Sequence, residues 1–212
     1  LDLVYSNLAE VDVIILQDYN KGVLTPFVIE NIIKKANELN IPTIVDPKTK
    51  NFKSYKNCAI FKPNLKEIKT GCNINFDENN MSEINSATKD LLEMINAKGI
   101  LLTLSGKGIC MQTADNFTHT KAGKRNITDV SGAGDTVVAV IGTILGRGGD
   151  LSVAARLANY AAGIVVSKIG TATVTIGELE DVVYGLAHKI SYAKICSLED
   201  ARSLVERWKA EK

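Results

Sequence analysis

The chain has 212 residues, a length that suits one domain, and its 25 Lys and Arg residues nearly balance its 24 Asp and Glu residues. The net charge of +1 gives no electrostatic basis for binding nucleic acid or an anionic membrane. The four cysteines lack the spacing of a zinc site or a disulfide framework, so we expect free thiols in a reducing compartment. Apolar runs stop short of the roughly 20 residues that span a membrane and no signal peptide is evident, so a cytoplasmic location is expected.

The first half of the chain alternates short apolar runs with amphipathic stretches, a pattern typical of parallel strands joined by helices. In chain order, the predicted strands cover residues 11–16, 42–45, 59–61 and 100–104. After the first strand, Thr25 and Pro26 supply the N-cap and first-turn proline of a helix whose apolar face runs from Val28 to Leu39. Another helix is predicted over about residues 82–96, before the fourth strand.

The second half begins with a predicted β-hairpin from Gly108 to Lys121, with its turn at residues 114–116. Helices are then predicted over about residues 132–147, 150–168 and 177–189. A last helix is predicted to begin near Ser197, because Ser197 and Asp200 are spaced as in a capping box. This order of elements predicts an α/β fold with a mostly parallel central sheet flanked by helices.

Polar side chains follow the predicted strands at the points where the strands end. Asp18, Asp46, Asn64 and Ser105 each come just after a strand. Ligands of parallel α/β sheets bind at the carboxyl ends of the strands. We therefore expect these four residues to converge on one edge of the sheet.

A glycine motif opens the helix predicted from residue 132. Residues 129–136 read Asp-Val-Ser-Gly-Ala-Gly-Asp-Thr, directly before an apolar run. Glycines at a helix N-terminus let an anion approach the unpaired N–H groups there. Asp135 adds a carboxylate beside this anion site, as a base next to a transferring phosphoryl group requires. The alternative is an ordinary helix capped by Asp129 or Ser131, with incidental glycines.

This motif resembles the signature of the ribokinase-like (PfkB-type) carbohydrate kinases. The other segments that match the family, in the family's order, are Asp18-Tyr19-Asn20-Lys21-Gly22, Asp46-Pro47-Lys48, Pro63-Asn64-Leu65-Lys66-Glu67, Thr103-Leu104-Ser105-Gly106-Lys107-Gly108, Asn159-Tyr160-Ala161-Ala162-Gly163 and Lys168-Ile169-Gly170-Thr171. The resemblance covers roughly residues 11 to 180 and implies the ribokinase-like three-layer fold. Within the family, the chain looks most like the D-glycero-D-manno-heptose 7-phosphate kinases of ADP-heptose synthesis.

The resemblance implies two metal sites. Asn64 and Glu67 correspond to residues that order Mg²⁺, partly through water, beside the nucleotide phosphates. Their spacing is also that of a helix capping box, and both roles can hold at once. Asp129 and Ser131 correspond to positions where relatives bind a monovalent cation such as K⁺, with helix capping as the alternative.

The resemblance also implies an ATP site. The residues assigned to it are Lys48, Asn64, Leu65, Lys66, Glu67, Ser105, Gly106, Gly108 and Asn159. Lys48 is expected near phosphate charge, although Asp46-Pro47-Lys48 is also a plausible turn. The loop from Ser105 to Gly108 is expected along the ribose and phosphates, with an ordinary hairpin entry as the alternative. Asn159 is expected to contact adenine, and close helix packing through the neighbouring small residues is the alternative.

The implied reaction is transfer of the ATP γ-phosphoryl group to the anomeric hydroxyl of heptose 7-phosphate, which gives a 1,7-bisphosphate. Asp135 would accept the hydroxyl proton, while the N–H groups of Gly132, Ala133 and Gly134 hold the transferring oxygens. The alternatives are a kinase for another sugar or a nucleoside, and a non-catalytic adenine-nucleotide-binding module. We expect no nucleic-acid or membrane partner, and a homodimer in the full-length protein.

The family's long N-terminal segment, which supplies a lid and much of the sugar pocket, has no match in this sequence. We therefore expect residues 1–190 to be the nucleotide-binding portion of a kinase domain, and 191–212 to be a helical tail or linker toward a further domain. On this basis the 212-residue chain is expected to bind ATP weakly and to phosphorylate no sugar.

Overall fold

The computed structural model describes residues 1–123 and 127–190. The chain divides into two compact units, Leu1–Val174 and Thr175–Lys212. In the second unit, helix α7 (Ile176–Ile190) agrees with the helix predicted at 177–189. The tail predicted at 191–212, with its helix near Ser197, lies outside the described residues. No helix in the described part of the chain is both long and apolar enough to cross a bilayer.

The first unit is built on a six-stranded sheet whose strands lie side by side in chain order. They are β1 (Ile14–Gln17), β2 (Thr43–Asp46), β3 (Ile60–Phe61), β4 (Gly99–Thr103), β5 (Ile109–Gln112) and β6 (Phe117–Thr120). The first four are parallel, whereas β5 and β6 form the predicted antiparallel hairpin. Its turn is closed by the Thr113 N–H, which donates to the Asn116 carbonyl at 2.8 Å. The mostly parallel sheet of the sequence prediction is confirmed.

The remaining elements precede β1, connect the strands or follow the hairpin. The α-helices of the first unit are α1 (Asp2–Asn7), α2 (Pro26–Glu38), α3 (Leu65–Cys72), α4 (Met81–Ile95), α5 (Ala133–Gly146) and α6 (Leu151–Val165). Short 3-10 helices are η1 (Leu8–Glu10), η2 (Thr49–Ser54) and η3 (Ser105–Lys107). The predicted cap of α2 is present, since the Thr25 hydroxyl accepts a hydrogen bond from the Val28 N–H at 3.3 Å. Helix α1 and η2 were not predicted, because neither shows the apolar periodicity of a longer helix.

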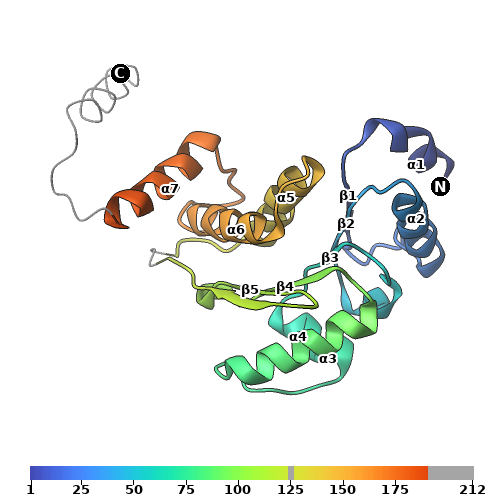
Figure 1. Ribbon diagram of the computed structural model, residues 1–212, viewed down its shortest axis with the longest axis horizontal. Helices are drawn as coiled ribbons and strands as arrows, with labels where there is room; N and C mark the ends of the chain where they lie inside the picture. Colours follow the sequence, from blue (N-terminus) through green and yellow to red (C-terminus); the bar gives the residue numbers. More distant parts are fainter. Residues whose placement is uncertain (124–126, 191–212) are drawn as a thin grey trace. The chain divides into compact units, whose positions relative to one another are not determined.

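Helices cover both faces of the sheet. Side chains of α2, η2, α3 and α4 form one core with the sheet, including Ile29, Phe52 and Leu91. Side chains of α5 and α6 form a second core on the opposite face, including Ile141 and Ala158. Figure 1 shows α3 and α4 on one side of the sheet and α5 and α6 on the other. This arrangement confirms the three-layer α/β fold expected from the sequence.

Helix α5 lies unusually close to the first strands. A Cβ atom added at Gly142 would come within 3.0 Å of Ile15 Cδ1 on β1 and 3.7 Å of Ile44 Cδ1 on β2. Glycine at this position therefore allows close packing of α5 on the strands without displacing the Ile15 side chain. This close packing places the N-terminus of α5 beside the carboxyl ends of β1 and β2.

Candidate active site

A cavity of about 630 Å³ lies at the carboxyl edge of the sheet, beside the N-terminus of α5. This volume is within the usual range for small-molecule sites. The sequence-predicted residues that line it are Lys48, Asn64, Glu67, Ser105, Gly106, Gly108, Gly132, Ala133, Gly134, Asp135 and Asn159. Leu65 and Lys66 are not among the lining residues. Leu65 packs against the core, and the Lys66 side chain is exposed.

The glycine motif forms the N-terminus of α5, and we call its residues Gly132, Ala133 and Gly134 the glycine mouth. Gly132 is the N-cap residue with φ 77°, a backbone conformation that favours glycine, and no side chain caps the helix. The N–H groups of the first helical turn have no partner within the helix, and Gly132, Ala133 and Gly134 line the cavity. The Ala133 N–H makes a long bond of 3.3 Å to the Val130 carbonyl. These amides and the positive end of the helix dipole make an anion site.

Asp129 and Ser131 do not cap α5, so the capping alternative for these residues is wrong. The Asp129 carboxylate accepts hydrogen bonds from the Ser131 N–H at 2.9 Å and from the Gly170 N–H at 3.2 Å. It thereby ties the loop before α5 to the loop after α6. The bonds from Ser131, followed by the bond from Gly170, hold the pKa of Asp129 below its ordinary value.

Asp135 lies in the first turn of α5, where two side chains from the end of β1 reach it. Its Oδ1 atom accepts a hydrogen bond from Gln17 Nε2 at 3.0 Å and a longer one from the Tyr19 hydroxyl at 3.5 Å. The sequence reasoning missed Gln17. The available signal was its position as a polar residue at the end of a strand, adjacent to the Asp18 motif.

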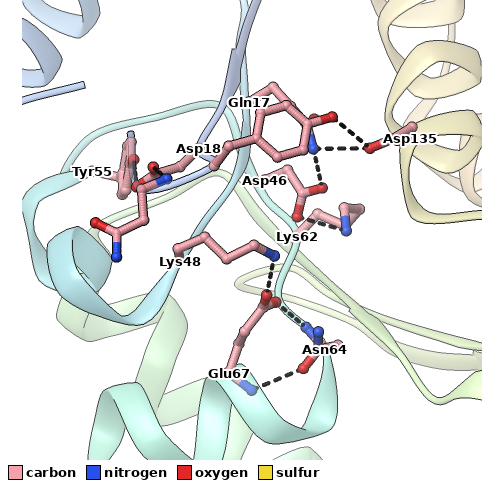
Figure 2. A network of polar contacts seen from close by, with 11 residues as sticks. Gln17, Asp18, Asp46, Lys48, Tyr55, Lys62, Asn64, Glu67 and Asp135 are labelled. Carbon is pink, nitrogen blue, oxygen red and sulfur yellow. Dashed lines mark hydrogen bonds and ion pairs between the residues drawn. The ribbon is translucent and has the colours of Figure 1, made fainter. Parts of the chain in front are cut away.

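A row of polar side chains crosses the carboxyl edge of the sheet on the face that α5 covers. Gln17 and Asp46 are paired residues of the parallel β1–β2 ladder, and Gln17 Nε2 donates to Asp46 Oδ2 at 2.6 Å. Lys62, directly after β3, pairs with Asp46 Oδ1 at 2.9 Å. We call Gln17, Asp46 and Lys62 the carboxyl-edge row. Figure 2 shows its contacts running from Lys62 through Asp46 and Gln17 to Asp135.

Lys62 brings a buried positive charge to the glycine mouth. The exposed fractions of the Lys62 and Asp46 side chains are only 4% and 7%. A Cβ atom built on Gly134 would lie 3.8 Å from Lys62 Nζ, so the ammonium group borders the anion site. The sequence reasoning missed this lysine, although a cation directly after a buried strand and before Pro63 was visible in the sequence.

Asp18 does not join the other strand-end residues, so the expected convergence of all four is wrong. Its buried carboxylate accepts hydrogen bonds from the Tyr55 hydroxyl at 2.8 Å and from the Asn20 N–H at 2.6 Å. Successive residues of a strand point to opposite faces, which sends Asp18 away from the face of Gln17. Burial, and then the hydrogen bond to Asp18, raise the pKa of Tyr55 far above its ordinary value.

The N-terminus of α3 contains the predicted capping box. The Asn64 side chain accepts from the Glu67 N–H, and Glu67 Oε2 accepts from the Asn64 N–H, both at 2.9 Å. Glu67 Oε1 also pairs with Lys48 Nζ at 2.7 Å. Burial acts to lower the pKa of Lys48, but its bond to Glu67 and the charge of Glu67 outweigh burial and raise it. Lys48 therefore lines the cavity as the ion-pair partner of the Glu67 carboxylate.

The same residues fit a magnesium ion held mainly by phosphates and water. Mg²⁺ in nucleotide sites uses one or two carboxylates and takes its other ligands from phosphates and water. Glu67 supplies one carboxylate and Asn64 an amide oxygen at the cavity wall. Among the side chains that the structure describes, no group of three or more His, Cys, Asp or Glu residues could hold a metal ion.

The far end of the cavity is more apolar. Asn159 on α6 donates a hydrogen bond to the Lys121 carbonyl at 2.9 Å, and Ala162 and Gly163 line the wall beside it. Ile127 and Val130 add apolar side chains that are largely exposed at the rim. Small residues beside apolar side chains leave space for a flat ring.

Comparison with known proteins gave a family match over most of the chain. The model of the pfkB family of carbohydrate kinases matches residues 2–176. A protein of Rhodospirillum rubrum named "Bifunctional protein HldE" is 38% identical over 209 residues, which is 97% of this chain and 41% of that protein. The protein of the same name in Geotalea uraniireducens is 38% identical over 213 residues, which is 100% of this chain and 42% of that protein. The chain thus spans about two-fifths of the length of these curated relatives.

Solved structures share the fold at low sequence identity. Phosphofructokinase-2 from Escherichia coli, in complex with potassium, has a TM-score of 0.77 at 17% identity, over 88% of this chain and 62% of that one. Ribokinase from Thermotoga maritima has a TM-score of 0.67 at 22% identity, over 85% and 59% of the two chains. At these identities, the likeness establishes the ribokinase-like fold.

Proposed function

Because the chain belongs to the pfkB family of carbohydrate kinases, we propose that its parent protein transfers the γ-phosphoryl group of ATP to a sugar hydroxyl. The proposed acceptor is the anomeric hydroxyl of D-glycero-D-manno-heptose 7-phosphate, with the 1,7-bisphosphate as product in ADP-heptose synthesis. The similarity to the proteins named HldE and the heptose-kinase motifs at residues 18–22, 46–48 and 168–171 support this acceptor.

The observation that carries the proposal is the position of Asp135 at the mouth of α5, beside the anion site. In the reaction, the sugar oxygen bonds to the γ-phosphorus as the bond from that phosphorus to the bridging oxygen of ADP breaks. The hydroxyl proton passes to the Asp135 carboxylate. A carboxylate is a weak base, which suits a step where the proton leaves only as the new bond forms.

The glycine mouth and Lys62 would stabilise the charge on the transferring group. The N–H groups of Gly132, Ala133 and Gly134 would bind its oxygens, and Lys62 Nζ borders the same site. Donors fixed before the reaction need no reorganisation during it, which is the main source of electrostatic catalysis. Magnesium bound near Asn64 and Glu67 would neutralise phosphate charge.

The remainder of the cavity would hold the nucleoside. The loop from Ser105 to Gly108 would lie along the ribose and phosphates, and Asn159 would face the adenine ring. We further propose that Asp129 and Ser131 contribute to a K⁺ site beside α5. The potassium complex of phosphofructokinase-2 is consistent with such a site in this fold.

The test of this proposal is Asp135→Asn in the complete protein, measured by coupled ADP release with heptose 7-phosphate. Turnover should fall by about two to four powers of ten, the usual contribution of a positioned base, while ATP-analogue affinity stays near normal. Asp115→Asn, in the exposed hairpin turn, is the matched control and should leave turnover unchanged. Near wild-type turnover of Asp135→Asn would remove this residue from the mechanism.

A panel of acceptors separates the heptose proposal from its alternatives. Heptose 7-phosphate, fructose 6-phosphate, ribose and adenosine are compared at equal concentration. Preference for another acceptor identifies a different family activity. Analogue binding without ADP release from any acceptor identifies a non-catalytic nucleotide-binding protein.

A further inference from the structure

We infer that Gln17 is the positioning residue for the base Asp135, and that it holds one carboxylate oxygen so that the other faces the acceptor hydroxyl. This inference rests on the proposed kinase function and deepens it. The evidence is the pair of hydrogen bonds that the Gln17 amide donates to Asp46 and Asp135 (Figure 2).

The first step concerns the geometry of the amide. A glutamine amide has one nitrogen with two protons that point about 120° apart. Nε2 of Gln17 donates to Asp46 Oδ2 at an N···O distance of 2.6 Å and to Asp135 Oδ1 at 3.0 Å. Gln17 thereby links a side chain on α5 to one on β2. In the described part of the chain, no hydrogen bond or ion pair joins Asp46 directly to Asp135.

The second step concerns what anchors the amide. Asp46 is itself fixed by its ion pair with Lys62, and both side chains are almost fully buried. The Gln17 and Asp46 backbones are paired in the β1–β2 ladder, so the amide approaches from a fixed strand. Sites held by strands and by a second layer of hydrogen bonds keep their geometry better than sites on loops.

The third step concerns which oxygen remains available. Oδ1 of Asp135 accepts from Gln17 and, at a longer distance, from Tyr19. Within the described residues, no hydrogen bond reaches Oδ2. The arrangement therefore leaves Oδ2 to accept the proton of the sugar hydroxyl.

The fourth step explains why a neutral amide suits this position. A cation paired directly with a carboxylate strongly favours its charged form and weakens it as a base. Here Lys62 pairs with Asp46, and the donors that contact Asp135 among the described residues are neutral. The positive charge of Lys62 thus lies beside Asp46 and the glycine mouth, while the neutral Gln17 amide orients the carboxylate of Asp135.

The experiment uses the complete protein with Gln17→Met, which keeps side-chain length and removes both donors. We expect kcat to fall about 10- to 100-fold, the scale of a misplaced catalytic group, with the KM for ATP changed less than about two-fold. Gln112→Met is the matched control. Gln112 is a buried glutamine at the end of β5 that donates to the Thr113 carbonyl outside the cavity, so its loss should change stability without changing kcat.

The pH dependence adds a readout that a merely structural role would not move. Among the described residues, the titratable groups linked to Asp135 are Tyr19 by a direct contact, Asp46 through Gln17, and Lys62 through its ion pair with Asp46. Gln17→Glu places a further carboxylate between Asp46 and Asp135, which favours protonation of the base. The acid limb of the pH–rate profile should therefore move to higher pH in Gln17→Glu, and less far in Gln17→Met.

A double-mutant cycle separates this inference from the proposed function. If Gln17 acts through Asp135, then adding Gln17→Met to Asp135→Asn should lower kcat no further. Wild-type turnover of Asp135→Asn would overturn the base assignment and this inference together. A loss in Asp135→Asn, combined with full kcat and an unmoved acid limb in Gln17→Met, would overturn the positioning role alone. Additive losses in the double variant would also overturn it.

Discussion

Among the described residues, Lys62 and Asp46 form the most buried ion pair at the cavity, and this pair bears on both stability and activity. A buried pair gains little stability over apolar side chains of the same size, because both charges lose water. Removing one partner is expensive, because the other charge remains buried and unpaired. The pair therefore contributes little net stability, whereas a cation beside Gly134 would serve the proposed phosphoryl transfer.

Lys62→Met is expected to separate stability from activity. It should lower the free energy of unfolding by about 3–5 kcal/mol, since it leaves the Asp46 charge uncompensated. Adding Asp46→Leu should restore most of this loss, but turnover should stay low. Urea denaturation and coupled ADP release measure the two effects. Turnover that recovers with stability in the double variant would show that Lys62 has no part in phosphoryl transfer.

Glu67→Gln is expected to separate metal binding from helix capping. Glutamine can still accept from the Asn64 N–H, so the capping box persists. The lost ion pair with Lys48 should cost at most about 1 kcal/mol, because Lys48 is partly exposed to solvent. The Mg²⁺ concentration for half-maximal turnover should rise sharply, with little change in melting temperature. A Mg²⁺ titration identical to wild type would leave Glu67 with only its capping role.

At the scale of elements, the hairpin entry shows how backbone shape builds the cavity wall. Gly108, between η3 and β5, has φ 97°, and a Cβ atom there would overlap the Thr120 carbonyl oxygen and lie 2.6 Å from the Ala122 nitrogen. Residues 122 and 123 line the cavity. Close contact between Gly108 and the segment from Thr120 to Ala122 therefore holds the loop after β6 against the cavity.

Gly108→Ala should disturb both the fold and the nucleotide site. A positive φ and backbone overlap predict a loss of at least about 2 kcal/mol, or roughly 4–8 °C in Tm. The displaced loop should also weaken ATP-analogue binding. Gly106→Ala is the control for thermal stability, since a Cβ atom at Gly106 meets nothing within 4 Å. Calorimetry compares the two variants, analogue titration compares Gly108→Ala with the wild type, and equal Tm values for the two variants would contradict this account.

At the scale of the whole molecule, two buried thiols report on the integrity of the first unit. Cys58 and Cys110 both lie in the core formed with α2, α3 and α4. Burial raises the pKa of each thiol from its ordinary value of 9.0 to about 12. At pH 8 the folded chain then holds only about one thiolate in 10⁴ at each position, and the thiolate is the reactive form.

Both thiols should therefore be alkylated only through unfolding of the unit. Mass spectrometry of peptides after a timed alkylation pulse measures this, with the half-buried Cys72 as an internal comparison that should react faster. Because the unfolded thiols ionise near pH 9 and the folded thiols near pH 12, their contribution to stability is complete below pH 9. It is lost as pH rises toward 12. Labelling of Cys58 or Cys110 as fast as Cys72 would contradict this account.

The sequence by itself determined the features that depend on neighbouring residues. The cap at Thr25, the capping box of Asn64 and Glu67, and the hairpin turn are set by spacings of three residues or fewer along the chain. The alternation of apolar runs with amphipathic stretches gave the order of strands and helices, because burial follows the period of each element. The glycine motif likewise identified the mouth of α5 and Asp135.

Only the tertiary structure decided which of these residues meet. Gln17 contacts Asp46, which is 29 positions away in the sequence, and Asp135, which is 118 positions away. These contacts depend on the register of the strands and on the packing of α5 against the sheet. The same alternation that aims Gln17 at the cavity turns Asp18 into the opposite core. A local pattern fixes the periodicity of an element but does not fix its register against distant partners. For this reason the contacts of Gln17 and Lys62 were decided only in the folded chain, although both residues stand at the ends of predicted strands.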